Sequence, residues 1–131
     1  DILILTGHDG FLKGGENDPQ NIKNYRNSAY FVDAVKEARR YEPNLDNLVI
    51  FAGACQSMYS AIITAGANFA SSPKRVLIHA LDPVLICKAV AQHSFRNILS
   101  PREVIDNTIT GIKGIGGIET RGKARQGEPK E

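Results

Sequence analysis

Two short apolar runs in the first half of the chain predict strands that are buried on both faces. Ile2–Leu5 is continuous in aliphatic residues and stops at Thr6-Gly7, and Leu48–Ala52 stops at Gly53. An unbroken apolar run of this length, bounded by glycine, is typical of a strand that is covered on both sides. We therefore expect both runs to lie inside a parallel sheet.

Between these runs, apolar residues recur at helical spacing. From Ser28 onward the apolar positions are Phe31, Ala34, Val35, Ala38 and Tyr41, with charged residues between them. This amphipathic pattern, ended by Pro43, predicts a helix that packs on the sheet. The order strand, helix, strand predicts a βαβ unit.

The second half of the chain continues the alternation. The predicted elements are a helix at Ser57–Gly66, strands at Asn68–Ser72 and Arg75–Ala80, a helix at Leu81–Phe95, and a helix from Ser100 to about Ile109. The last helix opens with Ser100-Pro101-Arg102-Glu103, a capping box with proline at the first helical position. Strands that alternate with helices imply parallel βαβ units, so the predicted fold class is α/β, a three-layer α/β/α sandwich with a mostly parallel sheet.

Two segments lack this periodicity. Phe11–Asn24 is rich in Gly, Asn, Asp and Pro and predicts a long polar loop directly after His8, in the position of a lid. Gly111–Glu131 is rich in glycine and then charged, which predicts irregular chain after Gly122 and glycines that pass close to the sheet edge. We expect one domain over residues 1–122, completed by elements upstream of Asp1, and a mobile tail over residues 123–131.

Composition narrows the classes of partner. The chain has 131 residues, which suits one domain, and its 16 Lys and Arg against 14 Asp and Glu give a net charge of +2. This balance argues against nucleic acid or an acidic membrane surface as the main partner. No apolar run approaches the roughly 18 residues of a membrane span, so we expect a soluble protein. Cys55 and Cys87 are too few for a disulfide framework or a four-ligand zinc site, so we expect free thiols in a reducing compartment, and neither metal nor cofactor.

The candidate catalytic residues follow the two apolar runs. His8 comes after the first run and Cys55 after the second. The carboxyl ends of parallel strands lie at one edge of a sheet, so the imidazole and the thiol are predicted to meet there. A thiol just before a helix gains thiolate character from the helix dipole, and a nearby imidazole can protonate a leaving amine. The pair is therefore predicted to be a nucleophile and its acid–base partner.

The other histidines and the second cysteine have simpler interpretations. His79 lies inside an apolar run and is interpreted as a core histidine, and His93, near a helix C-terminus, as a surface residue. Cys87 lies in a predicted apolar helix and is interpreted as a buried structural thiol. Gly117–Lys123 fits GxxxxGK but lacks the Ser or Thr that should follow, so we reject a phosphate loop.

The order and spacing of His8 and Cys55 point to a particular family. His8 precedes Cys55 by 47 residues, and Ala54-Cys55-Gln56 fits the A-C-[RQG] signature of caspase-type enzymes, whose histidine lies about 50 residues upstream. The chain resembles the YabG family of sporulation-specific cysteine proteases over most of its length. The segments that carry the resemblance are TGHDG at 6–10, NYRNSAYFVDAVKEARRYEP at 24–43, NLVIFAGACQS at 47–57, AGANFASSPKRVLIHALDPV at 65–84 and NTITGIKGIGGIETRG at 107–122.

This resemblance implies a caspase-like fold and a thiol protease with a His8–Cys55 dyad. It further implies that the substrates are proteins of the spore coat and cortex, cleaved after arginine. The expected location is the cytoplasm of the mother cell of a sporulating bacterium, or the spore coat. The oligomeric state is left open.

A peptidase of this kind also needs donors for the oxyanion. The Cys55 N–H is expected to be one of them, and the N–H of Asp9 or Gly10 the second. Asp9 stands directly after the histidine, where caspase-like enzymes usually have glycine.

Specificity for arginine needs a carboxylate in the substrate pocket. Asp82, which ends the run RVLIHALD, is the first choice, with Asp46 and Asp9 behind it. By analogy with the caspase-like fold, the backbone of Phe69–Ser72, including Ser71 and Ser72, is expected to pair with the substrate.

Two other functions remain open. In a cysteine amidotransferase or hydrolase, Cys55 would pair instead with His79 or His93, although Ser57 stands where a G-x-C-x-G nucleophile elbow has its second glycine. In a flavodoxin-like binding or scaffold module of spore assembly, Cys55 would be a structural thiol. Replacement of His8 distinguishes the first alternative from the peptidase, and the reactivity of Cys55 distinguishes the second.

Overall fold

The computed structural model describes residues 1–125. Its helices and strands, in chain order, are β1 (Ile2–Leu5), α1 (Ser28–Tyr41), β2 (Val49–Ala52), α2 (Tyr59–Ala65), β3 (Phe69–Ser71), α3 (Asp82–Gln92), β4 (Ile98–Leu99), α4 (Pro101–Asp106), β5 (Ile115–Gly117) and β6 (Thr120–Arg121). Short 3₁₀ turns lie at η1 (Gly15–Asn17), η2 (Ile22–Asn24) and η3 (Gly111–Lys113). Residues 126–131, most of the predicted mobile tail, lie outside the described part.

A mixed sheet with the strand order β1-β2-β3-β5 organises the chain. β1, β2 and β3 are parallel, and β5 runs antiparallel to β3. Leu5 lies opposite Ala52, and Ala52 lies opposite Ala70, so the three parallel strands end at one edge, which we call the carboxyl edge. The predicted α/β class with a mostly parallel sheet is confirmed.

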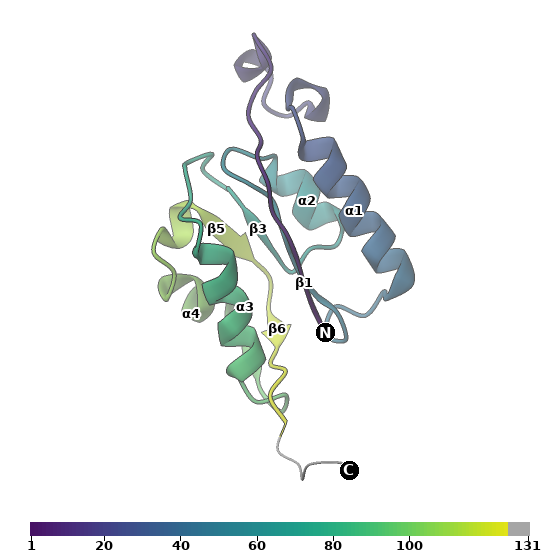
Figure 1. The fold of residues 1–131 in the computed structure, drawn as a ribbon, viewed down its shortest axis with the longest axis vertical. Coiled ribbons are helices and arrows are strands. Elements are labelled where there is room, and N and C mark those ends of the chain that lie inside the picture. The colour runs from purple at the N-terminus through teal and green to yellow at the C-terminus, as the bar shows by residue number, and fades with distance from the viewer. Residues whose placement is uncertain (126–131) are drawn as a thin grey trace.

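Helices cover both faces of this sheet: α1 and α2 pack on one side, and α3 and α4 on the other (Figure 1). The side chains of β2 alternate between the two faces. Val49 and Phe51 join the core cluster of α3 and α4, whereas Ile50 and Ala52 join that of α1 and α2. All four are fully buried, as an unbroken apolar run predicts for a central strand.

β1 is less covered than its sequence predicts. It lies at the edge of the sheet, with β2 as its neighbour, and Ile4 is 40% exposed. An edge strand has a neighbouring strand on one side only, so part of its apolar surface stays in contact with water. The expectation that Ile2–Leu5 is buried on both faces was therefore wrong.

The predicted helices are present, with small differences. In α1, Val32 is buried, while Tyr41 is 88% exposed, so the apolar stripe is rotated slightly from the predicted one. α4 ends at Asp106, and the Ser100 hydroxyl makes no capping hydrogen bond, so the predicted capping box does not form.

The strand predicted at Arg75–Ala80 does not form, and β5 occupies the place next to β3 instead. β5 lies in the segment whose glycines were predicted to pass close to the sheet edge, but no strand was predicted there. Its glycines are needed for close packing, because a Cβ on Gly117 would lie 2.3 Å from Phe69 Cδ1, and one on Gly116 would lie 2.4 Å from the Tyr59 hydroxyl. Glycine has no side chain to contribute to an apolar pattern, which is why hydrophobicity did not reveal this strand.

We expect Gly117→Ala to lower the free energy of unfolding by about 1–3 kcal/mol, because the added methyl group forces β5 away from the ring of Phe69. Urea unfolding measures this change. Gly7→Ala is a suitable control, because the nearest atom to its added Cβ is Phe31 Cζ at 3.5 Å, an ordinary contact. Equal stability of the two variants would contradict the packing argument.

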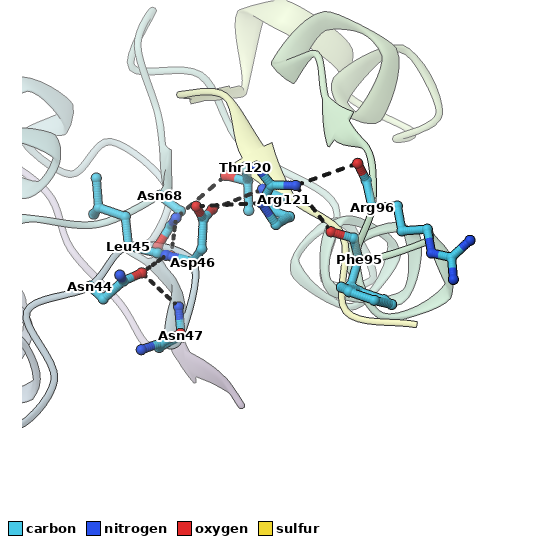
Figure 2. A network of polar contacts seen from close by, with 9 residues as sticks. All are labelled: Asn44, Leu45, Asp46, Asn47, Asn68, Phe95, Arg96, Thr120 and Arg121. Carbon is cyan, nitrogen blue, oxygen red and sulfur yellow. Dashed lines mark hydrogen bonds and ion pairs between the residues drawn. The ribbon is translucent and has the colours of Figure 1, made fainter. Parts of the chain in front are cut away.

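A polar network connects the C-terminal strand β6 to the edge of the sheet where β2 and β3 begin, which we call the amino edge (Figure 2). Asp46 Oδ1 accepts the N–H of Arg121 at 3.0 Å, and the Arg121 guanidinium donates to the carbonyl of Phe95 at 3.2 Å. In the same network, Asn68 Nδ2 donates to the Leu45 carbonyl at 3.0 Å. These contacts hold the C-terminal segment against the strand starts.

Part of the predicted mobile tail is bonded to α3. The N–H of Lys123 donates to the Val90 carbonyl at 3.0 Å, and that of Ala124 donates to the His93 carbonyl at 2.8 Å. Both residues lie outside the helices and strands, and Ala124 forms an isolated bridge with Ser94. Within residues 1–125, none of the helices combines the length and the apolarity needed to cross a membrane.

Candidate active site

His8 and Cys55 follow neighbouring parallel strands at the carboxyl edge. β1 ends at Leu5 opposite Ala52, the last residue of β2, and each candidate comes three positions after its strand. The Gly53 N–H donates to the Leu5 carbonyl at 3.0 Å and extends the ladder by one bond. The topology thus brings the two loops to one edge, with His8 exposed and Cys55 half-buried.

The sulfur of Cys55 contacts the backbone of a loop that sequence analysis did not associate with it. Cys55 Sγ accepts the N–H of Ile78 at 3.3 Å and lies 3.9 Å from the Ile78 carbonyl oxygen. These contacts orient the thiol. They also show that the extended chain around Ile78, which does not join the sheet, forms one wall of the candidate site.

A sharp turn after β2 presents Cys55 near its apex. Gly53 has φ +121°, and a Cβ there would lie 2.9 Å from Ser57 Oγ and 3.0 Å from the Ser71 carbonyl oxygen, so this position requires glycine. The buried Ser57 hydroxyl donates to the Ser71 carbonyl at 2.8 Å and accepts the Ala54 N–H at 3.2 Å. Ser57, which stands where an elbow motif would have glycine, closes this turn with its side chain.

The loop that carries His8 is bonded to the start of α1. Asn27 Nδ2 donates to the His8 carbonyl at 2.7 Å. The Asp9 carboxylate accepts the N–H of Gly10 at 2.8 Å, the N–H of Asn27 at 2.9 Å and the hydroxyl of Ser28. Asp9 therefore acts at the first turn of α1, where the helix has free N–H groups and favours negative charge.

These hydrogen bonds determine which backbone N–H groups are free to bind an oxyanion. The Gly10 N–H is already used by Asp9 Oδ1, whereas the N–H groups of Asp9 and Cys55 have no hydrogen-bond acceptor among residues 1–125. Free N–H groups on the two neighbouring turns are what an oxyanion site requires.

Asp82, the first choice for the substrate pocket, is a fully buried residue of the framework. Its exposed fraction is 0%, and Oδ1 accepts the N–H of Ile109 at 2.8 Å. Oδ2 accepts the N–H groups of His79 at 3.2 Å and Thr110 at 3.3 Å, and also the Thr110 hydroxyl. The carboxylate joins the loop before α3 to the loop after α4, and it offers no solvent-exposed oxygen to a substrate guanidinium.

The second choice, Asp46, lies at the other end of β2. It bonds to Arg121 at the amino edge (Figure 2). Cys55 follows the carboxyl end of the same strand. The structure therefore does not bring Asp46 and Cys55 together.

Ser71 and Ser72 are buried, and β3 is bonded on both sides, by β2 and by β5. The Ser72 hydroxyl donates to the Val76 carbonyl at 2.9 Å. Since Phe69–Ser71 has no free edge, we do not assign substrate pairing to it. The Ser71 hydroxyl is the buried side-chain polar group without a hydrogen-bond partner within residues 1–125.

The remaining histidines occupy different places. His79 is exposed, so its interpretation as a core histidine was wrong; its Nδ1 accepts the N–H of Leu81 at 3.1 Å, and it directly follows Ile78. His93 is half-buried at the C-terminal cap of α3. A helix of this length places it about 16 Å along the axis from the end at Asp82.

Cys87 is buried in α3, as expected, and burial raises the pKa of its thiol to about 11. At neutral pH this sulfur is a thiol rather than a thiolate, which makes it a poor nucleophile. The two cysteines are therefore placed in contrasting environments, one in the core and one at the carboxyl edge.

Two cavities lie beside the start of α2. One of about 170 Å³ is lined by residues of the turn that follows Cys55, by Ser72-Pro73 and Arg75, and by Pro19, Gln20 and Tyr25 from the long loop. The other, of about 680 Å³, extends along α1 and α2 and shares Gln20, Met58 and Ser60 with the first. The loop predicted at Phe11–Asn24 therefore forms a wall of both cavities, and neither Cys55 nor His8 is among the residues that line them.

Sequence analysis missed Ser28 and Ile78 as residues of this site. Ser28 had a usable signal, because Asn27-Ser28 directly precedes the helical pattern and both are residue types that favour helix starts. Ile78 had none, because it contributes backbone atoms whose neighbours depend on the fold. Within residues 1–125, His, Cys, Asp and Glu side chains form no group of three that could hold a metal ion.

Comparison with known proteins identifies the family. The family model described as YabG peptidase U57 matches residues 1–129. The sporulation-specific protease YabG of Bacillus subtilis (strain 168) is 53% identical over 131 residues, which cover 98% of this chain and 44% of that protein. The chain thus spans less than half the length of this relative, and no solved structure matches it. Since the family model and the relative both match nearly the whole chain, it belongs to the YabG peptidase U57 family.

Proposed function

We propose that this chain carries the active site of a cysteine endopeptidase, with Cys55 as nucleophile and His8 as acid–base partner. The observation that carries the proposal is the parallel pairing of β1 and β2, which delivers both loops to the carboxyl edge. The relative named a sporulation-specific protease supports the same class of reaction.

The reaction would follow from this arrangement. The Cys55 thiolate attacks the peptide carbonyl carbon, and the N–H groups of Cys55 and Asp9 bind the resulting oxyanion. His8 donates its proton to the amine as the C–N bond breaks, which leaves a thioester on Cys55. His8 then accepts a proton from water, and the resulting hydroxide attacks the thioester carbonyl carbon, which releases the acyl group as a carboxylic acid and restores the Cys55 thiolate beside a protonated His8. We prefer Asp9 to Gly10 as the second donor because the Gly10 N–H already bonds to a carboxylate.

We further propose that the architecture is a three-layer sandwich of the caspase-like type. The support is the pair of apolar clusters on opposite faces of the sheet, one with α1 and α2 and the other with α3 and α4. In such a fold the loops beyond the carboxyl ends of the parallel strands form the active site.

Cleavage after arginine remains part of the proposal, with a different acid. The carboxylates of Asp82, Asp46 and Asp9 each accept internal hydrogen bonds. Asp18 instead lines the cavity of about 680 Å³, which also contacts Met58 of the Cys55 loop. We therefore propose Asp18 as the residue that binds the substrate guanidinium.

Pairing of Cys55 with His79, as in an amidotransferase or another cysteine hydrolase, is a second candidate. One observation favours it: His79 is exposed and directly follows Ile78, whose N–H bonds to the Cys55 sulfur. His93 is a weaker partner because the length of α3 separates it from this end of the molecule.

We expect dilute iodoacetamide at neutral pH to alkylate Cys55 in the folded chain and to abolish peptidase activity in proportion. Cys87 should stay unmodified, because it is buried and its pKa is raised to about 11, so little of it is thiolate. Mass spectrometry of tryptic peptides measures both sites, and labelling in urea shows that Cys87 can react once unfolded. Equally slow labelling of both cysteines in the folded chain would instead favour the non-enzymatic, flavodoxin-like module.

For the biological setting, we propose a role in a sporulating cell, since the relative is named sporulation-specific. The proposed substrates are proteins of the spore coat and cortex. The proposed location is the cytoplasm of the mother cell or the spore coat.

A further inference from the structure

Ser28 connects the loop of His8 to the loop of Cys55. It is the first residue of α1, with an exposed fraction of 0%. Its hydroxyl donates to Asp9 Oδ2, and its oxygen accepts the N–H of Met58 at 2.8 Å. A serine hydroxyl has one proton to donate and lone pairs to accept, so both bonds can exist at once.

On the histidine side, the bonds around Ser28 hold the backbone before and after the imidazole. Asp9 Oδ1 binds the N–H groups of Gly10 and Asn27, at 2.8 and 2.9 Å. The Asn27 side chain binds the His8 carbonyl at 2.7 Å. The position of His8 therefore depends on the start of α1, where Ser28 and Asp9 meet.

On the cysteine side, the bond reaches the end of the nucleophile turn. Met58 comes three residues after Cys55 and directly after Ser57, whose buried hydroxyl closes the turn. The ladder between β1 and β2 ends at the bond from the Gly53 N–H to the Leu5 carbonyl. Beyond that bond, the hydrogen bonds that connect the two loops within residues 1–125 pass through Ser28.

We propose that Ser28 is a positioning residue that sets the separation of the His8 imidazole and the Cys55 thiol. The proposal rests on the peptidase function proposed above. Ser28 touches neither reacting group, so it acts through Asp9 on one side and Met58 on the other. Alanine would remove both bonds, leaving a carboxylate oxygen and a backbone N–H without their partner and letting the loops move independently.

The expected result is a selective loss in kcat. Displacement of a catalytic group by about 1 Å can reduce the rate by about 10²-fold. We expect Ser28→Ala to lower kcat about 10- to 100-fold for a fluorogenic peptide that ends in arginine, with KM changed less than about threefold, because the proposed binding cavities keep their walls.

The Asp9→Asn variant tests the same connection without the loss of the serine. Asparagine keeps the oxygen that accepts from Gly10 and Asn27, and replaces the oxygen that accepts from Ser28. If the two residues act as one unit, the double variant will lose no more kcat than Ser28→Ala alone. If the factor by which kcat falls in the double variant equals the product of the factors in the two single variants, the residues act independently and the proposal is overturned.

Ser100→Ala is the matched control, because Ser100 also stands at a helix start but its hydroxyl makes no capping bond. Its kcat should equal that of the wild type. A kcat of Ser28→Ala within twofold of the wild type overturns the role of Ser28. If Ser28→Ala does not fold, Asp9→Asn decides in its place: a tenfold lower kcat at unchanged KM supports the proposal, and an unchanged kcat overturns it. Turnover in the wild type that survives in Cys55→Ala overturns the proposed peptidase mechanism instead.

Discussion

Under the proposed mechanism, replacement of Cys55 by alanine will lower kcat/KM for an arginine-terminated peptide by at least about 10³-fold, because the variant lacks the thiol that forms the covalent intermediate. The unfolding temperature should change little. Cys55 is half-buried, and its hydrogen bonds are to the backbone of a single residue, Ile78, so its loss leaves the core intact. The assay uses purified protein, the fluorogenic peptide and a thermal unfolding curve for each variant.

His8→Ala tests the other half of the dyad and should lower kcat by about 10²- to 10⁴-fold, the usual contribution of a positioned acid–base group. His79→Ala is the matched control, because both histidines are exposed and neither belongs to an apolar core cluster. Under the proposed mechanism, His79→Ala retains nearly full activity. The reverse pattern, with His79 essential and His8 dispensable, would support the amidotransferase or hydrolase pairing.

Replacement of Asp82 by alanine will destabilise the fold by about 3–5 kcal/mol. The cause is the set of four donors, from His79, Ile109 and Thr110, that lose their acceptor inside the protein. Urea unfolding of wild type and variant measures the loss. A stability within 1 kcal/mol of the wild type would show that these donors find other acceptors, and would reopen the question of what Asp82 does.

Conservative variants of Asp82 and Asp18 test which of the two residues binds the arginine of the substrate. Asp82→Asn keeps an acceptor oxygen and should preserve the preference for arginine over lysine peptides, since the buried carboxylate does not reach the substrate. Under the proposed assignment, Asp18→Asn removes a charge that lines the cavity of about 680 Å³ along α1 and α2 and should lower kcat/KM for arginine peptides about tenfold. Loss of the preference in the Asp82 variant alone would restore the assignment made from the sequence.

The elements that sequence analysis predicted well share one property: their environment is uniform along the chain. β2 reads as an unbroken apolar run because both of its faces are covered, and α1 reads as an amphipathic helix because one face meets the sheet. β5 escaped detection because close packing against Phe69 and Tyr59 selects glycine, which carries no periodic signal. The segment Arg75–Ala80 was predicted to be a strand because it contains consecutive apolar residues. In the structure it is a loop beside Cys55 that pairs with no strand.

Asp82 shows the limit most clearly for the site. The sequence placed Asp82 at the end of a strand over Arg75–Ala80, but this strand does not form and Asp82 instead opens α3 as a buried residue. Position along the chain does not reveal which groups its oxygens will meet. Loops that lie some thirty residues apart in sequence supply its donors, in the segments around His79 and Thr110. Ser28 is a similar case, because its second partner, Met58, lies thirty residues away in the sequence.

The sequence by itself determined the strands β1 and β2, the helix between them and, through the connectivity of a parallel βαβ unit, the arrival of His8 and Cys55 at one edge. Only the tertiary structure decided which polar atoms bond to which: Asp9 to Ser28, Asp82 to the loops around it, and Ile78 to the thiol. The physical reason is range. The burial and the type of an element can be inferred from the pattern of neighbouring residues. A hydrogen bond between distant loops depends instead on how whole elements are placed relative to one another, and no local sequence pattern contains that information.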